Sequence, residues 1–401
     1  MRSKKLFNRT EFSGSLGDIG TLLPIATGMI LINQLNPLGV FFSIGLYYLF
    51  SGLYFKVPVP VQPMKLIGTY AIAMGLSSQQ VLASGLIMAV ILFLLGITNL
   101  VTVIGQYIPK SVVRGVQLST GVLLLNQGLK LVIGTSQYQK IQQMAEPFLK
   151  VSDIGVLAIP IGIVMGITGA ALILLLINSK RFPAGLAVVL LGLFTGLCFG
   201  RYKGFESFTP GLFLPDILGF EFPARVDFVF AMFALVLPQL PMTIGNAVIA
   251  YVDLSKDYFA ERSGRVTYRS AILSMSFANV LSFLLGGVPL CHGSGGLAAH
   301  YRFGARNLSS NIIIGGIFTS LALFFGSSLL GIVYLIPMAV LGVLLIFAGA
   351  QLAITVYDLK TKNEYFIVII MLGVTLVANL SVGFAVGVIL TLIFKWSRIS
   401  I

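Results

Sequence analysis

A polar, glycine-rich stretch at residues 286–306, GGVPLCHGSGGLAAHYRFGAR, lies between two long apolar segments. Its residues 288–291 are predicted to be extended, and its residues 294–303 to form a short helix. A helix that begins inside a membrane leaves its first N–H groups without intrahelical partners, and these groups carry partial positive charge. The stretch therefore predicts a place where an anion is held.

A second stretch of the same kind, KVPVPVQPMKLIG at residues 56–68, precedes a short apolar segment at residues 64–75. Its prolines Pro58, Pro60 and Pro63 prevent the incoming chain from continuing as a helix. We therefore expect two half-length helices, each preceded by a short extended strand, and we expect the rest of the chain to bring their starts together.

The composition indicates an integral membrane protein. Of 401 residues, 57% are hydrophobic and 10% are charged, whereas soluble domains carry about 25% charged residues. The net charge of +13 comes from Lys and Arg in short loops, so we expect a lipid bilayer and no nucleic acid as partner. Cys198 and Cys291 form neither a disulfide framework nor a metal cluster, and we predict no metal and no cofactor.

Apolar runs predict an all-α protein with fourteen membrane segments. The twelve long segments lie near residues 13–34, 38–55, 79–104, 110–133, 154–178, 184–200, 227–251, 267–286, 309–328, 330–354, 364–379 and 381–396, and the two half-length segments at 64–75 and 294–303. Longer loops fall at residues 134–153 and 201–226.

Matching proline motifs predict an inverted repeat of seven plus seven segments. Pro58 precedes the third segment as Pro289 precedes the tenth, at an offset of 231, and Pro109 precedes the fifth as Pro337 precedes the twelfth, at an offset of 228. Because seven is an odd number, the two halves lie in opposite orientations, as in secondary transporters with broken helices at the bilayer midplane.

The distribution of basic residues predicts that both termini are cytoplasmic. With the N-terminus inside, nineteen Lys and Arg residues fall on the inner side and six on the outer side, and Lys65 lies within a segment. The basic N-terminus precedes an apolar segment without a cleavage site, so it reads as a retained first span. We expect residence in a bacterial plasma membrane. Arg302 and Arg306 fall at the inner surface, which favours a role as topology anchors.

In inverted halves the two half-helices start near the midplane and face each other, which implies a central site because irregular backbone in a membrane lines a cavity or is buried. The residues at these starts are Gln62, Lys65, His292, Gly293, Ser294, Gly295 and Gly296, none of which is acidic. The alternative is that the glycines only pack and the prolines only kink. His292 without a second metal ligand favours a hydrogen-bonding role over a metal site.

The first and eighth segments, which are equivalent in the repeat, are unusually polar. Gln239, Thr243 and Asn246 of the eighth segment offer amides and a hydroxyl to complete the site. Asp18 is the carboxylate set well inside an apolar segment. Its interpretation is open between a proton-coupling group, a partner for Lys65, and a helix-end residue near the interface.

Four motifs together resemble the molybdate transporter family related to the sulfate permeases. These motifs are GSLGDIGTLLP (residues 14–24), PVPVQPMK, LPQLPMTIGNAVIA and PLCHGSGGLAAHYRFGAR. The resemblance spans essentially the whole chain. Leu290 departs from the family pattern, which has Met before Cys-His.

The resemblance implies a core of segments 1–4 and 8–11, at residues 1–104 and 227–328, and a gate of segments 5–7 and 12–14, at residues 105–226 and 329–401, with no appended soluble domain. It also implies uptake of molybdate. We expect a secondary importer rather than an enzyme, working by movement of the core against the gate, with proton symport as one hypothesis for the coupling. Sulfate or tungstate as substrate and an anion channel of the same fold are the alternatives left open. Whether the protein forms a homodimer is also open. Carboxylate pairs, metal clusters and nucleophile triads that would favour a membrane enzyme are missing from the sequence.

Overall fold

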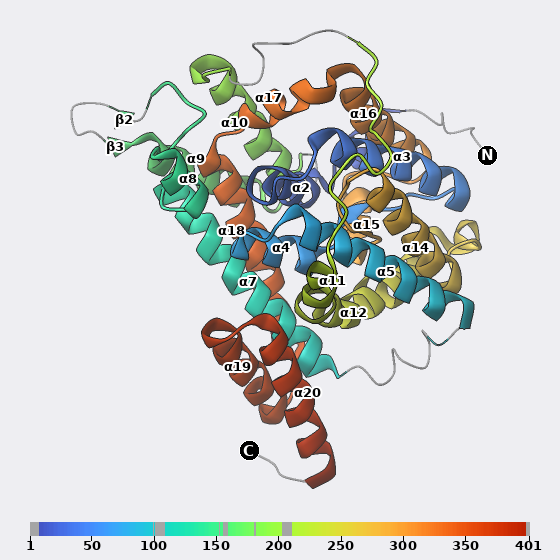
Figure 1. Cartoon of the computed structure of the whole chain (residues 1–401). Helices are drawn as coiled ribbons and strands as arrows, with labels where there is room; N and C mark the ends of the chain where they lie inside the picture. Colours follow the sequence, from blue (N-terminus) through green and yellow to red (C-terminus); the bar gives the residue numbers. More distant parts are fainter. Residues whose placement is uncertain are drawn as a thin grey trace.

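The computed structural model describes residues 8–98, 100, 109–151, 153–154, 159–179, 182–202 and 211–397. Predictions for the end of the fourth segment, for most of residues 152–158, and for Arg2, Lys4, Lys5, Lys180, Arg181, Lys203 and Arg398 fall outside these residues. The described chain is predominantly helical (Figure 1), as the apolar runs predict.

The first half contains seven segments in the predicted order. They are α1 (Arg9–Ser15) with α2 (Ile19–Asn33), α3 (Pro37–Phe55), α4 (Lys65–Met74), α5 (Ser78–Thr98), α7 (Lys110–Ile133), α9 (Ile161–Leu176) and α10 (Ala184–Phe199). The strand β1 (Gln62–Pro63) precedes α4, the short helix α8 (Gln137–Gln142) follows α7, and a hairpin of β2 (Asp153–Ile154) and β3 (Ile159–Pro160) precedes α9.

The second half repeats this order. The eighth segment is a continuous run of α11 (Arg225–Ala231), the π-helix η1 (Met232–Val236), α12 (Leu237–Met242), the π-helix η2 (Thr243–Ala250), α13 (Tyr251–Phe259) and η3 (Ala260–Ser263). After it come α14 (Tyr268–Leu284), β4 (Leu290–Cys291), α15 (Ser294–Arg302), α16 (Ser309–Phe325), η4 (Gly326–Ser328), α17 (Leu329–Tyr334), α18 (Met338–Ile354), η5 (Thr355–Asp358), α19 (Lys362–Val377) and α20 (Leu380–Ser397).

Three predicted segments differ in detail because of proline and glycine. The run at 330–354 is two helices, α17 and α18, because Pro337 is the N-cap of α18. The sixth segment starts at Ile161 rather than at 154, after Pro160. A proline restricts the residue before it to extended conformations, so both helices begin after the proline. The first segment breaks between α1 and α2 at Gly17, whose Cα lies against α15.

Helix pairs from the two halves show the inverted repeat. Gly121 and Gly128 of α7 lie against Gly349 and Gly342 of α18, so these fifth and twelfth segments run antiparallel. A Cβ atom on Gly121 would lie 2.6 Å from the carbonyl oxygen of Gly349, so the small residues allow the close approach. The second segment α3 packs on the eleventh, α16, and the equivalent fourth and ninth segments, α5 and α14, also pack together. This symmetric pairing fits a seven-plus-seven inverted repeat.

The two predicted extended stretches form one small antiparallel sheet. β1 pairs with β4 so that Gln62 faces Cys291 and Pro63 faces Leu290. The backbone N–H of Met64 also donates to the carbonyl oxygen of Pro289 at 2.7 Å. The half-helices α4 and α15 start directly after these strands, so the sheet brings the two helix starts side by side.

Loops predicted on the same side of the membrane contact each other. On the predicted inner side, Arg265 donates to the carbonyl oxygen of Tyr54, and Arg262 donates to the side chain of Asn307. On the predicted outer side, the backbone N–H of Leu218 donates to the carbonyl oxygen of Leu284 at 2.7 Å. This grouping agrees with the predicted order of the segments.

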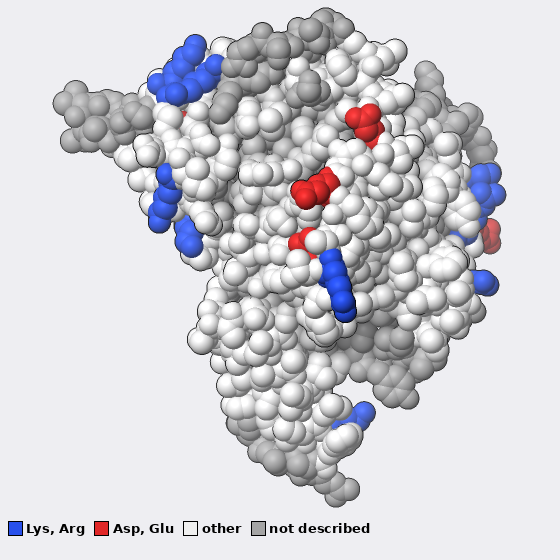
Figure 2. Space-filling model, viewed as in Figure 1, with Lys and Arg blue, Asp and Glu red and all other residues white. Residues whose placement is uncertain are grey.

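The surface and helix lengths agree with a membrane environment. Six helical stretches in the described part of the chain are long and apolar enough to span a bilayer. Figure 2 shows wide areas without charged side chains on the face that it draws, with Lys and Arg in separate patches. The protein is therefore an integral membrane protein.

Candidate functional site

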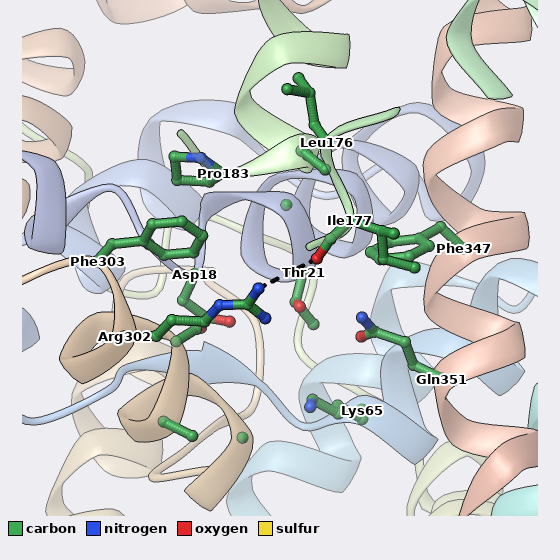
Figure 3. Close-up of a pocket in the computed structure, with 17 residues that line it drawn as sticks. Asp18, Thr21, Lys65, Leu176, Ile177, Pro183, Arg302, Phe303, Phe347 and Gln351 are labelled. Atoms are coloured by element: carbon green, nitrogen blue, oxygen red, sulfur yellow. Dashed lines mark hydrogen bonds between the residues drawn. The ribbon is translucent and has the colours of Figure 1, made fainter. Parts of the chain in front are cut away.

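Two neighbouring cavities lie between the predicted core and the predicted gate, at the starts of the half-helices. The larger has a volume of about 310 Å³ and the smaller of about 220 Å³. Thr21, Lys65, Gly295 and Gln351 line both cavities, so the two volumes meet at these residues. Figure 3 shows the side chains of Thr21, Lys65 and Gln351 directed into the larger cavity.

The start of α15 is open toward these cavities. Its N-cap residue, Gly293, has no side chain that could accept a hydrogen bond. The backbone N–H groups of Ser294 and Gly295 have no hydrogen-bond acceptor among the described residues. Ser294 lines the smaller cavity and Gly295 lines both. Unpaired N–H groups at a helix start can bind an anion, and the anion site expected here stays a prediction.

Lys65, the first residue of α4, supplies a positive charge to the same place. A Cβ atom on Gly295 would lie 3.6 Å from the Lys65 ammonium nitrogen. Within the described ranges, the ion pairs are Lys110–Asp358 and Arg114–Asp358, so Lys65 has no carboxylate within 4.0 Å there. A partly buried ammonium without a carboxylate partner is costly, and an anion in the cavity would compensate its charge.

The start of α4 is closed by a side chain of the eighth segment. The Oε1 atom of Gln239 accepts hydrogen bonds from the backbone N–H groups of Leu66 at 3.1 Å and Ile67 at 3.2 Å. The Nε2 atom of Gln239 donates to Thr243 Oγ1 at 2.9 Å, which fixes the orientation of the amide. Neither Gln239 nor Thr243 lines the two cavities. These two residues therefore lie behind α4 rather than in the cavity.

Asn246 lies in front of the start of α15. Its Oδ1 atom accepts a 2.6 Å hydrogen bond from Ser294 Oγ, and its Nδ2 atom would lie 3.6 Å from a Cβ atom on Gly293. Asn246 lines the smaller cavity. It belongs to the π-helix η2, a form that is frequent at functional sites. The Nδ2 atom of Asn246 has no hydrogen-bond partner among the described residues, so its hydrogens can be donated to an anion.

Asp18 and Gln62 form a buried pair beside the start of α15. Gln62 donates from Nε2 to Asp18 Oδ2, and both residues are buried. Asp18 lines the larger cavity, but Gln62 lines neither cavity. A Cβ atom on Gly296 would lie 2.7 Å from Asp18 Oδ2, and one on Gly293 would lie 2.5 Å from Gln62 Oε1. Both glycines are needed for this close approach.

His292 points into the protein interior rather than into the cavities. Its Nδ1 atom lies 2.9 Å from the carbonyl oxygen of Pro60, and its Nε2 atom lies 3.1 Å from Tyr47 OH and 3.0 Å from Ser274 Oγ. The ring also stacks on Tyr47. Both ring nitrogens are therefore engaged by protein groups, and no described group of His, Cys, Asp or Glu residues has the makings of a metal site.

The cavities also contain residues that the sequence argument did not select. Gln117 of α7 lines the smaller cavity, and Gln351 of α18 lines both. Gln351 is an isolated polar residue in an apolar segment, which is a signal that sequence offers, whereas Gln117 is followed by Ser119 and Thr120 and does not stand out. Arg302 lines the larger cavity and donates to the carbonyl oxygen of Ile177 at 3.2 Å (Figure 3). It also donates to the carbonyl oxygen of Ser179 at 3.2 Å.

Solved anion transporters share this fold. The transmembrane domain of a cyanobacterial bicarbonate transporter, BicA, matches 97% of this chain and 98% of its own length with a TM-score of 0.65 at 15% identity. Murine Solute Carrier 26 family member A9, described as an anion transporter in the inward-facing state, matches 99% of this chain and 69% of its own with a TM-score of 0.65 at 15% identity. At this identity the likeness shows the fold alone.

Sequence comparisons give the family. The family model described as "Molybdate transporter of MFS superfamily" matches residues 10–124 and 231–352. Molybdate transporter 2 of Arabidopsis thaliana is 32% identical over 96% of this chain and 87% of its own length, and Molybdate transporter 1 of Chlamydomonas reinhardtii is 29% identical over 95% and 90%. This description names the MFS superfamily, whose transporters have two halves related as parallel repeats. The helix pairing in this chain fits inverted repeats instead. By sequence, the chain belongs to the molybdate transporter family.

Proposed function

We propose that this protein is a secondary active importer of molybdate that holds the oxyanion at the start of α15. The observation that carries this proposal is the combination, in one cavity, of the open N–H groups of Ser294 and Gly295 with the ammonium of Lys65, which has no carboxylate within 4.0 Å among the described residues. The amide of Asn246 adds a neutral donor. Together these groups offer hydrogen bonds and positive charge to a tetrahedral dianion, and none of them is acidic.

The energies of such contacts are adequate for micromolar binding. A helix start contributes roughly 0.3–2 kcal/mol to the binding of an anion, and each hydrogen bond to a charged group contributes about 1.5–3 kcal/mol. One helix start with Lys65 and Asn246 therefore supplies roughly 3–8 kcal/mol, and the upper end of this range corresponds to a micromolar Kd.

Asp18 makes proton symport the coupling that fits this site. Its carboxyl group lies against Gly296, one residue from the open N–H groups. A negative charge there opposes the binding of a dianion, and a proton on Asp18 removes the opposition. Binding of the proton and binding of the anion therefore favour each other, and this reciprocal linkage is what symport requires.

Alternating access would arise from movement of the core against the gate. Between the predicted domains, Gly20 of α2 lies directly against Gly185 of α10, where a Cβ atom on Gly20 would lie 2.9 Å from the Gly185 Cα. Arg302 of the core reaches the residues that follow α9. Small residues and a few polar contacts along this boundary favour sliding of one domain past the other.

The function is tested by uptake of radiolabelled molybdate into proteoliposomes. We expect uptake that saturates, that depends on an imposed proton gradient, and that unlabelled tungstate inhibits. Transport of sulfate without transport of, or competition by, molybdate would reject the proposed substrate. Uptake that ignores the gradient and runs at the rates of a pore would instead identify an anion channel.

Replacing Asp18 tests the coupling separately. In Asp18→Asn we expect molybdate binding to persist and the pH dependence of uptake to disappear, because the amide cannot release a proton. Asp253→Asn, on an exposed part of α13, is a control that should keep the wild-type pH profile. An unchanged pH profile in Asp18→Asn would leave Asp18 as a structural residue.

A further inference from the structure

Gln117 faces the proposed anion site from the opposite domain. It lies on α7 of the predicted gate and lines the smaller cavity together with Lys65, Asn246 and Ser294 of the predicted core. Its side chain is buried, with an exposed fraction of 5%. A buried polar residue on this wall of the cavity needs a hydrogen-bond partner for each end of its amide group.

The carbonyl end of the Gln117 amide is fully occupied. Its Oε1 atom accepts a hydrogen bond from Arg114 Nη1 at 2.7 Å. It also lies 2.9 Å from Thr355 Oγ1, whose single proton is shared with the carbonyl oxygen of Leu352 at 2.7 Å. Because a guanidinium group only donates hydrogen bonds, the amide cannot be turned around without placing two donors against each other. The Nε2 atom has no hydrogen-bond partner among the described residues. The amide NH₂ group is therefore the end left for the cavity.

An ion-pair cluster holds Arg114 in this position. Asp358 accepts from Arg114 Nε at 2.9 Å and from Arg114 Nη2 at 2.5 Å, a two-pronged arrangement with strict geometry. Lys110 lies 3.2 Å from the same carboxylate and donates to the Asp358 carbonyl oxygen at 2.8 Å. A chain of contacts thus runs from Asp358 through Arg114 to the Gln117 amide.

We propose that Gln117 is a ligand of the oxyanion supplied by the gate, and that Arg114 and Asp358 are positioning residues that keep its NH₂ group directed at the anion. This inference rests on the proposed function of the cavity. It adds a donor from α7 to the donors of α15, so the anion is held from both domains when the site lies against the gate. The amide contributes no charge, which suits a ligand that must release the anion.

The direct test is Gln117→Glu, compared with wild type for molybdate uptake and for binding to the purified protein by calorimetry. The glutamate still accepts from Arg114 and Thr355, but it presents an oxygen instead of an NH₂ group to the dianion. We expect Kd and KM to rise by about tenfold or more, since a hydrogen bond to a charged group is lost and a repulsion is added.

Gln127→Glu is the matched control, because Gln127 lies on the same helix and lines a different cavity. It introduces the same charge into α7, and we expect a change of less than about twofold. Gln117→Ala, which removes the amide without adding charge, is a second variant. A wild-type Kd in both Gln117 variants would overturn the inference, provided that wild type itself binds molybdate. Failure of wild type to bind would instead reject the proposed function.

The positioning role is tested by Asp358→Asn. If Asp358 acts only as a charge, its removal makes the cavity more positive and tightens molybdate binding. If it positions the amide through Arg114, binding weakens by a few fold, and the change has no further effect in a Gln117→Ala background. Tighter binding, or an additive loss in the double variant, would overturn the positioning role. The elution profile and thermal unfolding of each variant confirm that it is folded.

Discussion

The starts of α4 and α15 are equivalent in the repeat, but they are not equivalent in what they offer to a ligand. At α4, Gln239 accepts from the N–H groups of Leu66 and Ile67, so of the first three N–H groups only that of Lys65 has no acceptor among the described residues. At α15, the N–H groups of Ser294 and Gly295 face the cavities without a described partner. In the proposed site, one half-helix therefore supplies backbone donors, and the other supplies the ammonium of Lys65.

A third helix start, that of α18, is occupied by an acidic side chain of the protein. The buried carboxylate of Glu146 accepts from the N–H groups of Met338 at 2.9 Å and Ala339 at 2.7 Å, at the start of α18. A neutral amide oxygen closes α4 and a carboxylate closes α18, whereas the start of α15 has no such side chain in the described chain. This contrast supports the proposal that the anion binds at the start of α15.

The largest effect is expected from removing the charge that α4 contributes. In Lys65→Gln, the dianion loses its opposite charge in a partly buried site, which costs about 2–5 kcal/mol. We therefore expect Kd for molybdate to rise roughly 30-fold or more. Lys56→Asn is a suitable control, because Lys56 is exposed and Asn tolerates its positive φ angle of 59°. Binding near the wild-type level in Lys65→Gln would show that backbone donors alone hold the anion.

Intermediate effects are expected from one substitution at each helix start, a loss of stability at α4 and a loss of affinity at α15. Gln239→Ala removes the acceptor at α4, so we expect the free energy of unfolding to fall by about 1–2 kcal/mol while the affinity changes little. Ser294→Ala frees the Asn246 amide at α15, so we expect Kd to rise about three- to tenfold with unchanged stability.

Thermal unfolding and calorimetric binding of both variants give the measurement. The prediction requires that stability falls in Gln239→Ala and that molybdate affinity falls in Ser294→Ala. A loss of affinity in Gln239→Ala as large as that in Ser294→Ala would mean that α4 also holds the substrate, and the contrast between the helix starts would then fail.

The smallest effect concerns the start of α18 and its dependence on pH. Burial raises the pKa of Glu146 to about 7, even though the hydrogen bonds from Met338 and Ala339 lower it. Because the folded state binds this proton more tightly than the unfolded state, stability is highest below the ordinary pKa and falls as pH rises through 7. We expect a loss of about 1 kcal/mol between pH 6 and pH 8.

Glu146→Gln provides the check on this pH dependence. The glutamine still offers an oxygen to the helix start, but it does not titrate. Its thermal unfolding temperature should therefore lack the component of the pH dependence between pH 6 and pH 8 that wild type shows. Identical slopes in the two proteins would exclude Glu146 as the titrating group.

Local sequence signals predicted the elements of the fold well. Apolar runs and prolines gave the segments, and the helix of the fifth segment begins and ends at the predicted residues, 110 and 133. The prolines Pro109 and Pro337 are N-caps of α7 and α18, which agrees with the predicted repeat. These signals work because a bilayer demands an apolar run of fixed length and because proline ends a helix wherever it occurs.

The sequence by itself determined that the chain crosses a membrane in two related halves and that two helices start in glycine- and proline-rich breaks. Only the tertiary structure decided which start is open, because Gln239 reaches α4 from a segment 172 residues or more away in sequence. It also decided that His292 faces the interior and that Gln117 and Gln351 face the cavities. Hydrophobic patterns show which segments can lie in the bilayer. The partner of each buried polar group depends instead on how distant segments pack.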